Sequence, residues 1–323
     1  MFSYRVFLKQ AWDITKRYRY LWFFGIFASL TAIGGEYQII SQGLNSNPGG
    51  SFTSIGIFML YNLFNPSFYA GIASLAASNP AALWSLASVL LLALFLVIIM
   101  VYLAIVSQAA LVEQSAQIIL NKKKKSGLNI SDGLSFGRKH FWHLLGLNLS
   151  NNILITFGFI LISLPLIFLL ITDAAVLTLA YTLLFVVFVP ISLAIAFIIK
   201  YAIAARVLEN LSFVSSIGKG WEIFRRNWLV SLEMALILFL INFAAGIVTI
   251  AAIFLFFLPL LVVSLQLYLP ILTATSFILT ISAMLVAASI INTFQISAWT
   301  SLYIRLQEKK GLSKLERIFK RRR

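Results

Sequence analysis

The chain has 323 residues, of which 61% are hydrophobic and 11% charged, and its formal net charge is +15. A soluble globular domain is usually about 45–50% apolar and about 25% charged, so this composition excludes an ordinary water-soluble protein. The absence of cysteine excludes disulfides, iron–sulfur clusters, thiol catalysis and cysteine-ligated metals. We therefore expect an all-α, polytopic transmembrane bundle, because lipid offers no partners for open backbone groups.

Long stretches without charge predict six transmembrane crossings, since one crossing needs about 20 mainly apolar residues. No Asp, Glu, Lys or Arg occurs in residues 234–304, and Glu36 is the only one between Arg19 and Glu113. The predicted crossings are residues 20–41, 81–112, 142–171, 174–200, 228–258 and 271–304.

The basic residues lie on one side of these crossings. All 25 Lys and Arg residues fall in four segments, namely 1–19, 122–139, 200–226 and 305–323. By the positive-inside rule, both termini are predicted to be cytoplasmic, in the cell (inner) membrane. Anionic lipid headgroups are the expected partner of this charge. Nucleic acid is not expected, because no soluble module gathers the basic residues.

The connection over residues 42–80 is uncharged and contains several glycines and prolines. We expect short helices over residues 54–68 and 69–77 that lie flat on the outer leaflet. The alternative is a re-entrant segment, which requires cover from protein or water.

A seven-residue pattern occurs three times, at residues 11–17, 133–139 and 220–226. Each copy reads small, large apolar, polar, apolar, any, basic, basic, and an aromatic residue and a crossing follow. Trp and paired basic residues are stable at the level of lipid headgroups. Each copy is therefore predicted to be an interfacial amphipathic helix leading into a crossing. The expected headgroup anchors are Trp12, Lys16, Arg17, Arg138, Lys139, Trp142, Trp221, Arg225, Arg226 and Trp228.

The ends of the first two helix pairs also repeat, because residues 109–114 resemble residues 205–210. We therefore expect one transmembrane domain, residues 1–310, made of three parallel units that each contain an interfacial helix and an antiparallel helix pair. The units are residues 1–120, 121–211 and 212–310. The alternative is that any helix entering from the cytoplasm is basic and then aromatic. Residues 311–323 are predicted to form a basic amphipathic cytoplasmic tail.

The segment Gly-Trp-Glu-Ile-Phe-Arg-Arg-Asn-Trp at residues 220–228, together with the helix pairs, carries a resemblance. It resembles uncharacterised prokaryotic six-helix membrane proteins and, loosely, the membrane domain attached to some glycerophosphodiester phosphodiesterases. The resemblance implies the fold and hardly implies a function, since the acid and histidine cluster of a phosphodiesterase is missing here. Mitochondrial carriers also have three helix pairs, but neither Pro165 nor Pro259 is followed by the acid and base of the carrier signature.

Amide side chains inside the crossings are candidates for function, because polar groups in lipid are costly. Asn148, Asn151 and Asn152 lie on one turn of the third crossing, Asn242 lies in the fifth, and the sixth contains a pair three residues apart, Asn292 and Gln295. They either line a polar path or form interhelical hydrogen bonds worth around 1 kcal/mol each.

Four acids complete the candidate set. Glu36 is placed near the outer face, as an interfacial carboxylate or an intramembrane group. Glu113 and Glu209 recur at equivalent places and are expected to cap or bridge units by pairing with motif basics. Glu233 either reaches the cytoplasm or forms an ion pair with Arg225, Arg226 or Lys200.

An enzyme is not expected, because no acid, base, nucleophile and metal converge in the pattern. His140 and His143 make a poor metal site, since zinc usually takes three or four protein ligands, and interfacial packing is favoured for both. No cofactor is predicted. Two functions stay open, a transporter or channel-like protein for a small or amphiphilic solute and, alternatively, a membrane scaffold or assembly factor that binds lipids or partner proteins.

Overall fold

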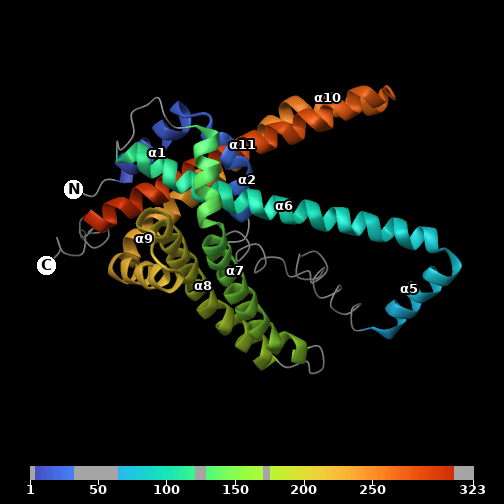
Figure 1. Ribbon diagram of the computed structural model, residues 1–323, viewed down its shortest axis with the longest axis horizontal. Helices are drawn as coiled ribbons and strands as arrows, with labels where there is room; N and C mark the ends of the chain where they lie inside the picture. The colour runs from blue at the N-terminus through green and yellow to red at the C-terminus, as the bar shows by residue number, and fades with distance from the viewer. Residues whose placement is uncertain (1–3, 33–64, 121–128, 170–174, 309–323) are drawn as a thin grey trace.

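The computed structural model describes residues 4–32, 65–120, 129–169 and 175–308 (Figure 1). Over these ranges the chain is all-helical, as predicted, and no strand is formed. Among the described residues, four helices are long and apolar enough to cross a membrane: Trp84–Ile119, Thr182–Glu209, Phe213–Gln266 and Pro270–Gln307. Glu36 and the predicted tail 311–323 lie outside the described residues.

The first third of the chain contains α1 (Tyr4–Arg17), α2 (Leu21–Ala32), α5 (Pro66–Ser78) and α6 (Pro80–Ile119). Helix α1 is amphipathic, as the motif predicts, and three residues separate it from α2. Its buried apolar side chains recur every three or four residues and so share one face: Tyr4, Phe7, Ala11 and Ile14. Helix α5 matches the short helix predicted at 69–77, extended at its start by three residues.

The remaining chain forms α7 (Ile130–Leu169), α8 (Ala175–Glu209), α9 (Phe213–Ala252), η1 (Ile253–Phe257), α10 (Leu258–Gln266) and α11 (Pro270–Glu308). The segment predicted to be interfacial and the segment predicted to cross form one helix in α7, whereas in α9 a kink separates them. Asn227 alone departs from helical geometry inside α9, with φ −135° and ψ 31°. The kink lies directly before residue 228, where the predicted crossing begins, and the helical run continues beyond residue 258 to Gln266.

The π-helical turn η1 directly precedes Pro259. Proline lacks an N–H group, and its ring collides with the carbonyl four residues earlier, so a regular α-turn is strained at this place. The wider turn relieves that collision: the Leu258 N–H donates to the Ile253 carbonyl, five residues back. The chain thereby continues as α10 without breaking the crossing.

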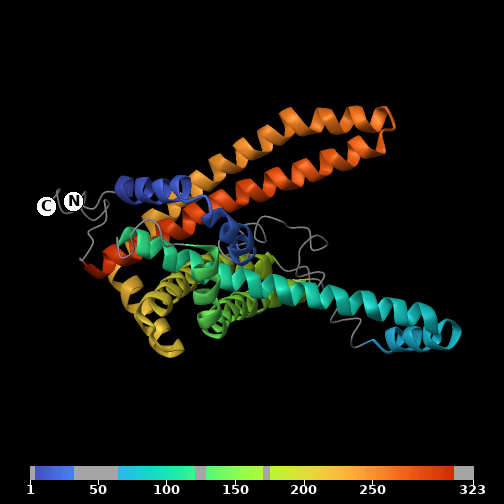
Figure 2. The ribbon, with the colours of Figure 1, turned by 45° about the horizontal axis from the view of Figure 1, so that its top comes forward.

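Three arms leave a common junction. Figure 1 shows three arms, α6 with α5 at its far end, α7 with α8, and α9–α10 with α11, and in Figure 2 the arm of α10 and α11 is still well apart from α6. The junction consists of residues 104–116 of α6, residues 196–207 of α8 and residues 294–306 of α11. Helices α1 and α2 pack on it. Nearly all fully buried large side chains belong to the junction or contact it, among them Tyr201, Tyr303, Leu111, Leu144 and Leu302.

The far halves of the arms are apolar and uncovered. Large exposed side chains run along α6 from Trp84 to Val101 and along α11 from Ile271 to Val286. Monomeric soluble proteins rarely expose apolar patches of this extent. Lipid is therefore the natural cover for the arms, whereas the junction is packed by the protein itself.

Glycines permit close helix contacts at the junction. A Cβ atom on Gly25, Gly137 or Gly220 would lie 2.4, 2.3 and 2.4 Å from a backbone oxygen of the neighbouring helix. Such contacts join α2 to α11, α7 to α6 and α9 to α8. Small residues of this kind let backbones approach in membrane proteins, where apolar surface alone does not drive helices together.

Candidate functional site

A cavity of about 630 Å³ lies where the three arms meet. Six helices contribute to its wall: α2, α6, α7, α8, α9 and α11. Six amide side chains reach it: Gln108, Asn148, Asn151, Asn242, Asn292 and Gln295. The structure thus brings together amides that are up to 187 positions apart in the chain, from residue 108 to residue 295.

Part of the amide set forms interhelical hydrogen bonds. Asn148 Nδ2 donates to Gln108 Oε1 at 2.8 Å and to the Leu144 carbonyl at 2.9 Å. Asn292 Nδ2 donates to the Gly25 carbonyl of α2 at 3.3 Å. These bonds tie α7 to α6 and α11 to α2 at the wall of the cavity.

Two amide oxygens in the cavity wall remain without a hydrogen-bond donor among the described residues. Within the described chain, the Oδ1 atoms of Asn151 and Asn242 are buried and have no hydrogen-bond partner. A buried polar atom without a partner costs about 1–3 kcal/mol. A cavity with such atoms in its wall is therefore suited to water or to a polar ligand group.

Lys200 supplies a positive charge at the wall. Its Nζ lies 4.8 Å from the ring centroid of Trp299, within the range of a cation–π contact. The sequence placed Lys200 at the cytoplasmic end of a crossing, but α8 continues for nine more residues to Glu209. At 1.5 Å per residue, Lys200 lies about 13 Å inside the end of its helix.

The part of the wall that α9 contributes is mostly apolar and open. Phe243, Ile247 and Ile250 line the cavity from α9 and are 59%, 52% and 56% exposed. At the junction end, by contrast, the neighbouring Ala205 and Leu302 are fully buried. The cavity is therefore amphiphilic: amides and the Lys200 ammonium group share its wall with exposed apolar side chains.

The other predicted polar residues lie away from the cavity. Asn152 is exposed and does not line it, because one residue turns a helix by about 100° from Asn151. Glu113 accepts a hydrogen bond of 2.6 Å from Gln117 on its own helix. Glu233 accepts one from the Tyr4 hydroxyl and so links α9 to α1.

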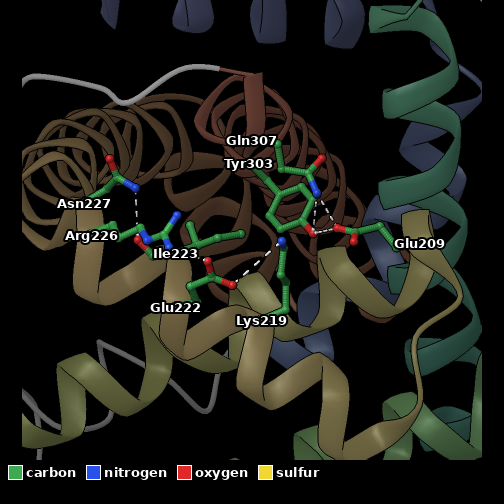
Figure 3. Close-up of polar contacts among 8 residues, drawn as sticks. All are labelled: Glu209, Lys219, Glu222, Ile223, Arg226, Asn227, Tyr303 and Gln307. Carbon is green, nitrogen blue, oxygen red and sulfur yellow. Dashed lines mark hydrogen bonds and ion pairs between the residues drawn. The ribbon is translucent and has the colours of Figure 1, made fainter.

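Glu209 ends α8 within a polar cluster at the junction. The Tyr303 hydroxyl and Gln307 Nε2, both on α11, donate to Glu209 Oε1 (Figure 3). Gln307 Nε2 also lies 3.2 Å from the Tyr303 hydroxyl. Glu209 therefore bridges the second and third predicted units through a buried tyrosine and an amide.

Removing the Tyr303 hydroxyl is expected to weaken that bridge. The variant Tyr303→Phe should lower the free energy of unfolding by about 1.5–3 kcal/mol, the usual net worth of a hydrogen bond to a charged group. Glu222→Gln is the matched control, because Glu222 pairs with Lys219 and Arg226 at the surface (Figure 3). Exposed pairs contribute about 0–1 kcal/mol, so Glu222→Gln should unfold nearly as the parent in detergent titrations. Equal loss in both variants would contradict a special role of Tyr303.

The two histidines join α7 to the end of α8 and to the connection that follows it. His140 is buried, stacks on Phe136, and its Nε2 lies 2.9 Å from Asn210 Oδ1. His143 Nδ1 accepts a 3.2 Å hydrogen bond from Arg206. In the part of the chain that the structure describes, no group of three potential metal ligands occurs.

The predicted headgroup anchors are on the surface. Trp12, Trp142, Trp221 and Trp228 are exposed. The six basic members of the motif are exposed as well: Lys16, Arg17, Arg138, Lys139, Arg225 and Arg226. An outward ring of aromatic and basic side chains is typical of contact with lipid headgroups.

Comparison with protein-family models, with curated proteins and with solved structures finds no match. The resemblance to six-helix prokaryotic membrane proteins therefore stays a prediction from the motif and the helix pairs.

Proposed function

We propose that this integral membrane protein crosses the cell (inner) membrane six times, with both termini cytoplasmic, and is a transporter or channel-like protein for a small or amphiphilic solute. The observation that carries the proposal is the convergence of six amides and Lys200 on one cavity of about 630 Å³. Ligand pockets are usually about 300–1,000 Å³, mainly apolar, with a few placed polar groups. The cavity matches that description.

Three parallel units explain how the cavity is enclosed. Helices α1 and α2 contact α11, α7 contacts α6, and α9 contacts α8. Each first helix thus packs on the second helix of the preceding unit, and the third unit closes on the first. Within the units, α2 contacts α6, α7 contacts α8, and α10 contacts α11. A ring of three units supports an axis along the membrane normal.

The burial of the motif supports the same three-unit arrangement. The small residue that opens each copy, Ala11, Gly133 or Gly220, is buried in all three. The basic pair that closes each copy is exposed in all three. The same arrangement therefore occurs in each proposed unit: the small residue packs against a neighbouring helix, and the basic pair lies on the surface.

Hydration of the cavity is the first property to test, and the absence of native cysteine makes the test direct. Gly246 lines the cavity, and a Cβ atom added there meets no atom within 4 Å. Because the thiolate is the reactive form and apolar surroundings suppress it, a thiol reacts with N-ethylmaleimide where water is present. Gly246→Cys should therefore react in reconstituted vesicles at least about tenfold faster than a lipid-facing thiol.

Val248→Cys is the matched control, two residues along α9 and 67% exposed on the apolar surface. Equal, slow labelling of both variants would contradict a water-filled cavity and with it the proposed path. A transporter or channel further requires flux: purified protein in liposomes should release a panel of small solutes, and the absence of any flux would oppose transport.

The exposed anchors favour a second candidate, a scaffold or assembly factor that organises lipids or partner proteins. Four exposed tryptophans and six exposed basic residues form a surface suited to anionic headgroups. This role requires stably bound lipid or a partner after gentle purification. Recovery of neither in native mass spectrometry would contradict it.

A further inference from the structure

We infer that the solute is an uncharged amphiphile with two neighbouring hydroxyl groups, which bind amides of the cavity while its hydrocarbon chain lies along α9. This inference rests on the proposed function and names the substrate class of the same cavity. Three observations support it: the neutral chemistry of the polar wall, the amide oxygens that lack donors, and the apolar stripe beside them.

The polar part of the wall consists mainly of uncharged amide and hydroxyl groups. No Asp or Glu occurs among the described residues that line the cavity, so a cationic solute would meet no counter-charge. Lys200 is engaged within the protein, since its Nζ lies over the ring of Trp299 and the residue takes part in a further interaction. Taking an ion out of water without a dedicated partner costs far more than burying a hydroxyl group that is hydrogen-bonded. The wall therefore favours a neutral headgroup.

Asn151 on α7 and Asn242 on α9 supply the groups that recognise this headgroup. Both side chains line the cavity, and among the described residues neither Oδ1 atom has a hydrogen-bond partner. A carboxylate or an ester cannot donate to these oxygens. A hydroxyl group both donates and accepts, so it matches the oxygen and the nitrogen of an amide alike. Two such amides on two helices favour a headgroup with two neighbouring hydroxyl groups.

The hydrocarbon chain has a matching surface on α9. Phe243, Ile247 and Ile250 recur every three or four residues and so share one face of the helix. All three line the cavity and are more than half exposed. Asn242 lies at the start of this stripe, about 12 Å along the helix axis from Ile250. A monoacylglycerol combines two neighbouring hydroxyl groups with one hydrocarbon chain, and 1-monooleoylglycerol is the probe that we choose.

Protection of Gly246→Cys tests the inference, because Gly246 lies one helical turn from Asn242 and lines the cavity. The variant is reconstituted in phosphatidylcholine vesicles, and then in vesicles with 1-monooleoylglycerol replacing part of that lipid. At about 80% occupancy the monoacylglycerol should slow labelling by N-ethylmaleimide about fivefold. The labelling of Val248→Cys should be the same in the two vesicle types. Equal labelling of Gly246→Cys in both types overturns this inference while the water-filled cavity stands.

Two further lipids separate the hydroxyl groups from the chain and from charge. Methyl oleate has the same chain and no hydroxyl group, and it should give no protection. Phosphatidylglycerol has two neighbouring hydroxyl groups and a charged phosphate, and relative to Val248→Cys in the same vesicles it should protect less than about twofold. Protection by methyl oleate equal to that of the monoacylglycerol overturns recognition of the hydroxyl groups. Equal protection by phosphatidylglycerol overturns the uncharged headgroup.

Replacing one amide by leucine tests which side chains bind the headgroup. Loss of one hydrogen bond weakens binding about fivefold, so Asn151→Leu combined with Gly246→Cys should reduce protection from about fivefold to less than about twofold. Asn242→Leu should give the same reduction. Asn152→Leu is the matched control, because Asn152 is exposed and does not line the cavity, and it should keep full protection. Protection is a ratio of rates within one variant, so a general change in reactivity cancels. Full protection in both Asn151→Leu and Asn242→Leu overturns the role of these amides.

The remaining outcomes separate the two proposals and the two sources of the hydroxyl groups. A Gly246→Cys thiol that reacts in neither vesicle type opposes the proposed function itself. Soluble glycerol, added to phosphatidylcholine vesicles, should give no protection because it lacks the chain that lies on α9. If glycerol protects as well as the monoacylglycerol, the occupant is a free polyol and the amphiphile is overturned.

Discussion

Replacing Gly220 by valine is expected to lower the free energy of unfolding by about 3 kcal/mol, the upper part of the usual range for overpacking. A Cβ atom at this position would lie 2.4 Å from the Ile198 carbonyl oxygen and 3.0 Å from the Ala202 nitrogen. Both are backbone atoms of α8, which cannot rotate away as a side chain can. The helices α8 and α9 would have to separate, and separation opens the junction. Unfolding in detergent, followed by circular dichroism, measures the loss.

Gly218→Ala is the matched control for that variant, since it lies on the same helix two residues earlier. A Cβ atom on Gly218 meets no atom within 4 Å. Alanine stabilises a helix interior by about 1 kcal/mol relative to glycine, so this variant should be as stable as the parent or slightly more stable. Similar stability of Gly220→Val and the parent would show that α8 and α9 do not touch at Gly220.

Replacing Leu302 by alanine is expected to destabilise the protein by about 3 kcal/mol, the middle of the range for a buried leucine. Leu302 is fully buried in the junction, within the cluster that contains Ala11, Tyr201 and Ala298. The truncation leaves a space that close-packed neighbours from α1, α8 and α11 fill only partly. The same denaturation experiment measures the effect.

Leu285→Ala provides the contrast on the same helix. Leu285 is 46% exposed on the far half of α11. Lipid chains are as apolar as leucine, so truncation at a lipid-facing site removes little stabilising energy. A cost as large as that of Leu302→Ala would contradict the division between a packed junction and lipid-covered arms.

The helical fold follows from local sequence properties. Residues 234–304 contain no charge, which excludes water as their surroundings and leaves the helix as the structure that satisfies its own backbone. The motif likewise predicted an amphipathic helix at α1, and the structure shows that its buried face includes Phe7, Ala11 and Ile14 while Trp12 is exposed. Helix ends were predicted less well: α8 extends nine residues beyond the predicted end at 200, because the junction covers its last turns.

The candidate site was predicted in part. Asn148, Asn242, Asn292 and Gln295 are polar residues within apolar runs, and that signal alone marked them as candidates. The cavity contains all four. Asn151 and Asn152 look alike in the sequence, yet only Asn151 lines the cavity, since neighbouring helix positions point about 100° apart.

The sequence by itself predicted that lipid surrounds the chain, that the fold is helical, and which polar side chains would be costly to expose to lipid. Which of those side chains meet was decided by the tertiary structure, because it depends on the rotation and crossing of six helices. Lys200 shows the difference: in sequence it is one of the basic residues that mark the end of a crossing. Packed against Trp299, about 13 Å inside the end of α8, it becomes a positive charge in the wall of a cavity.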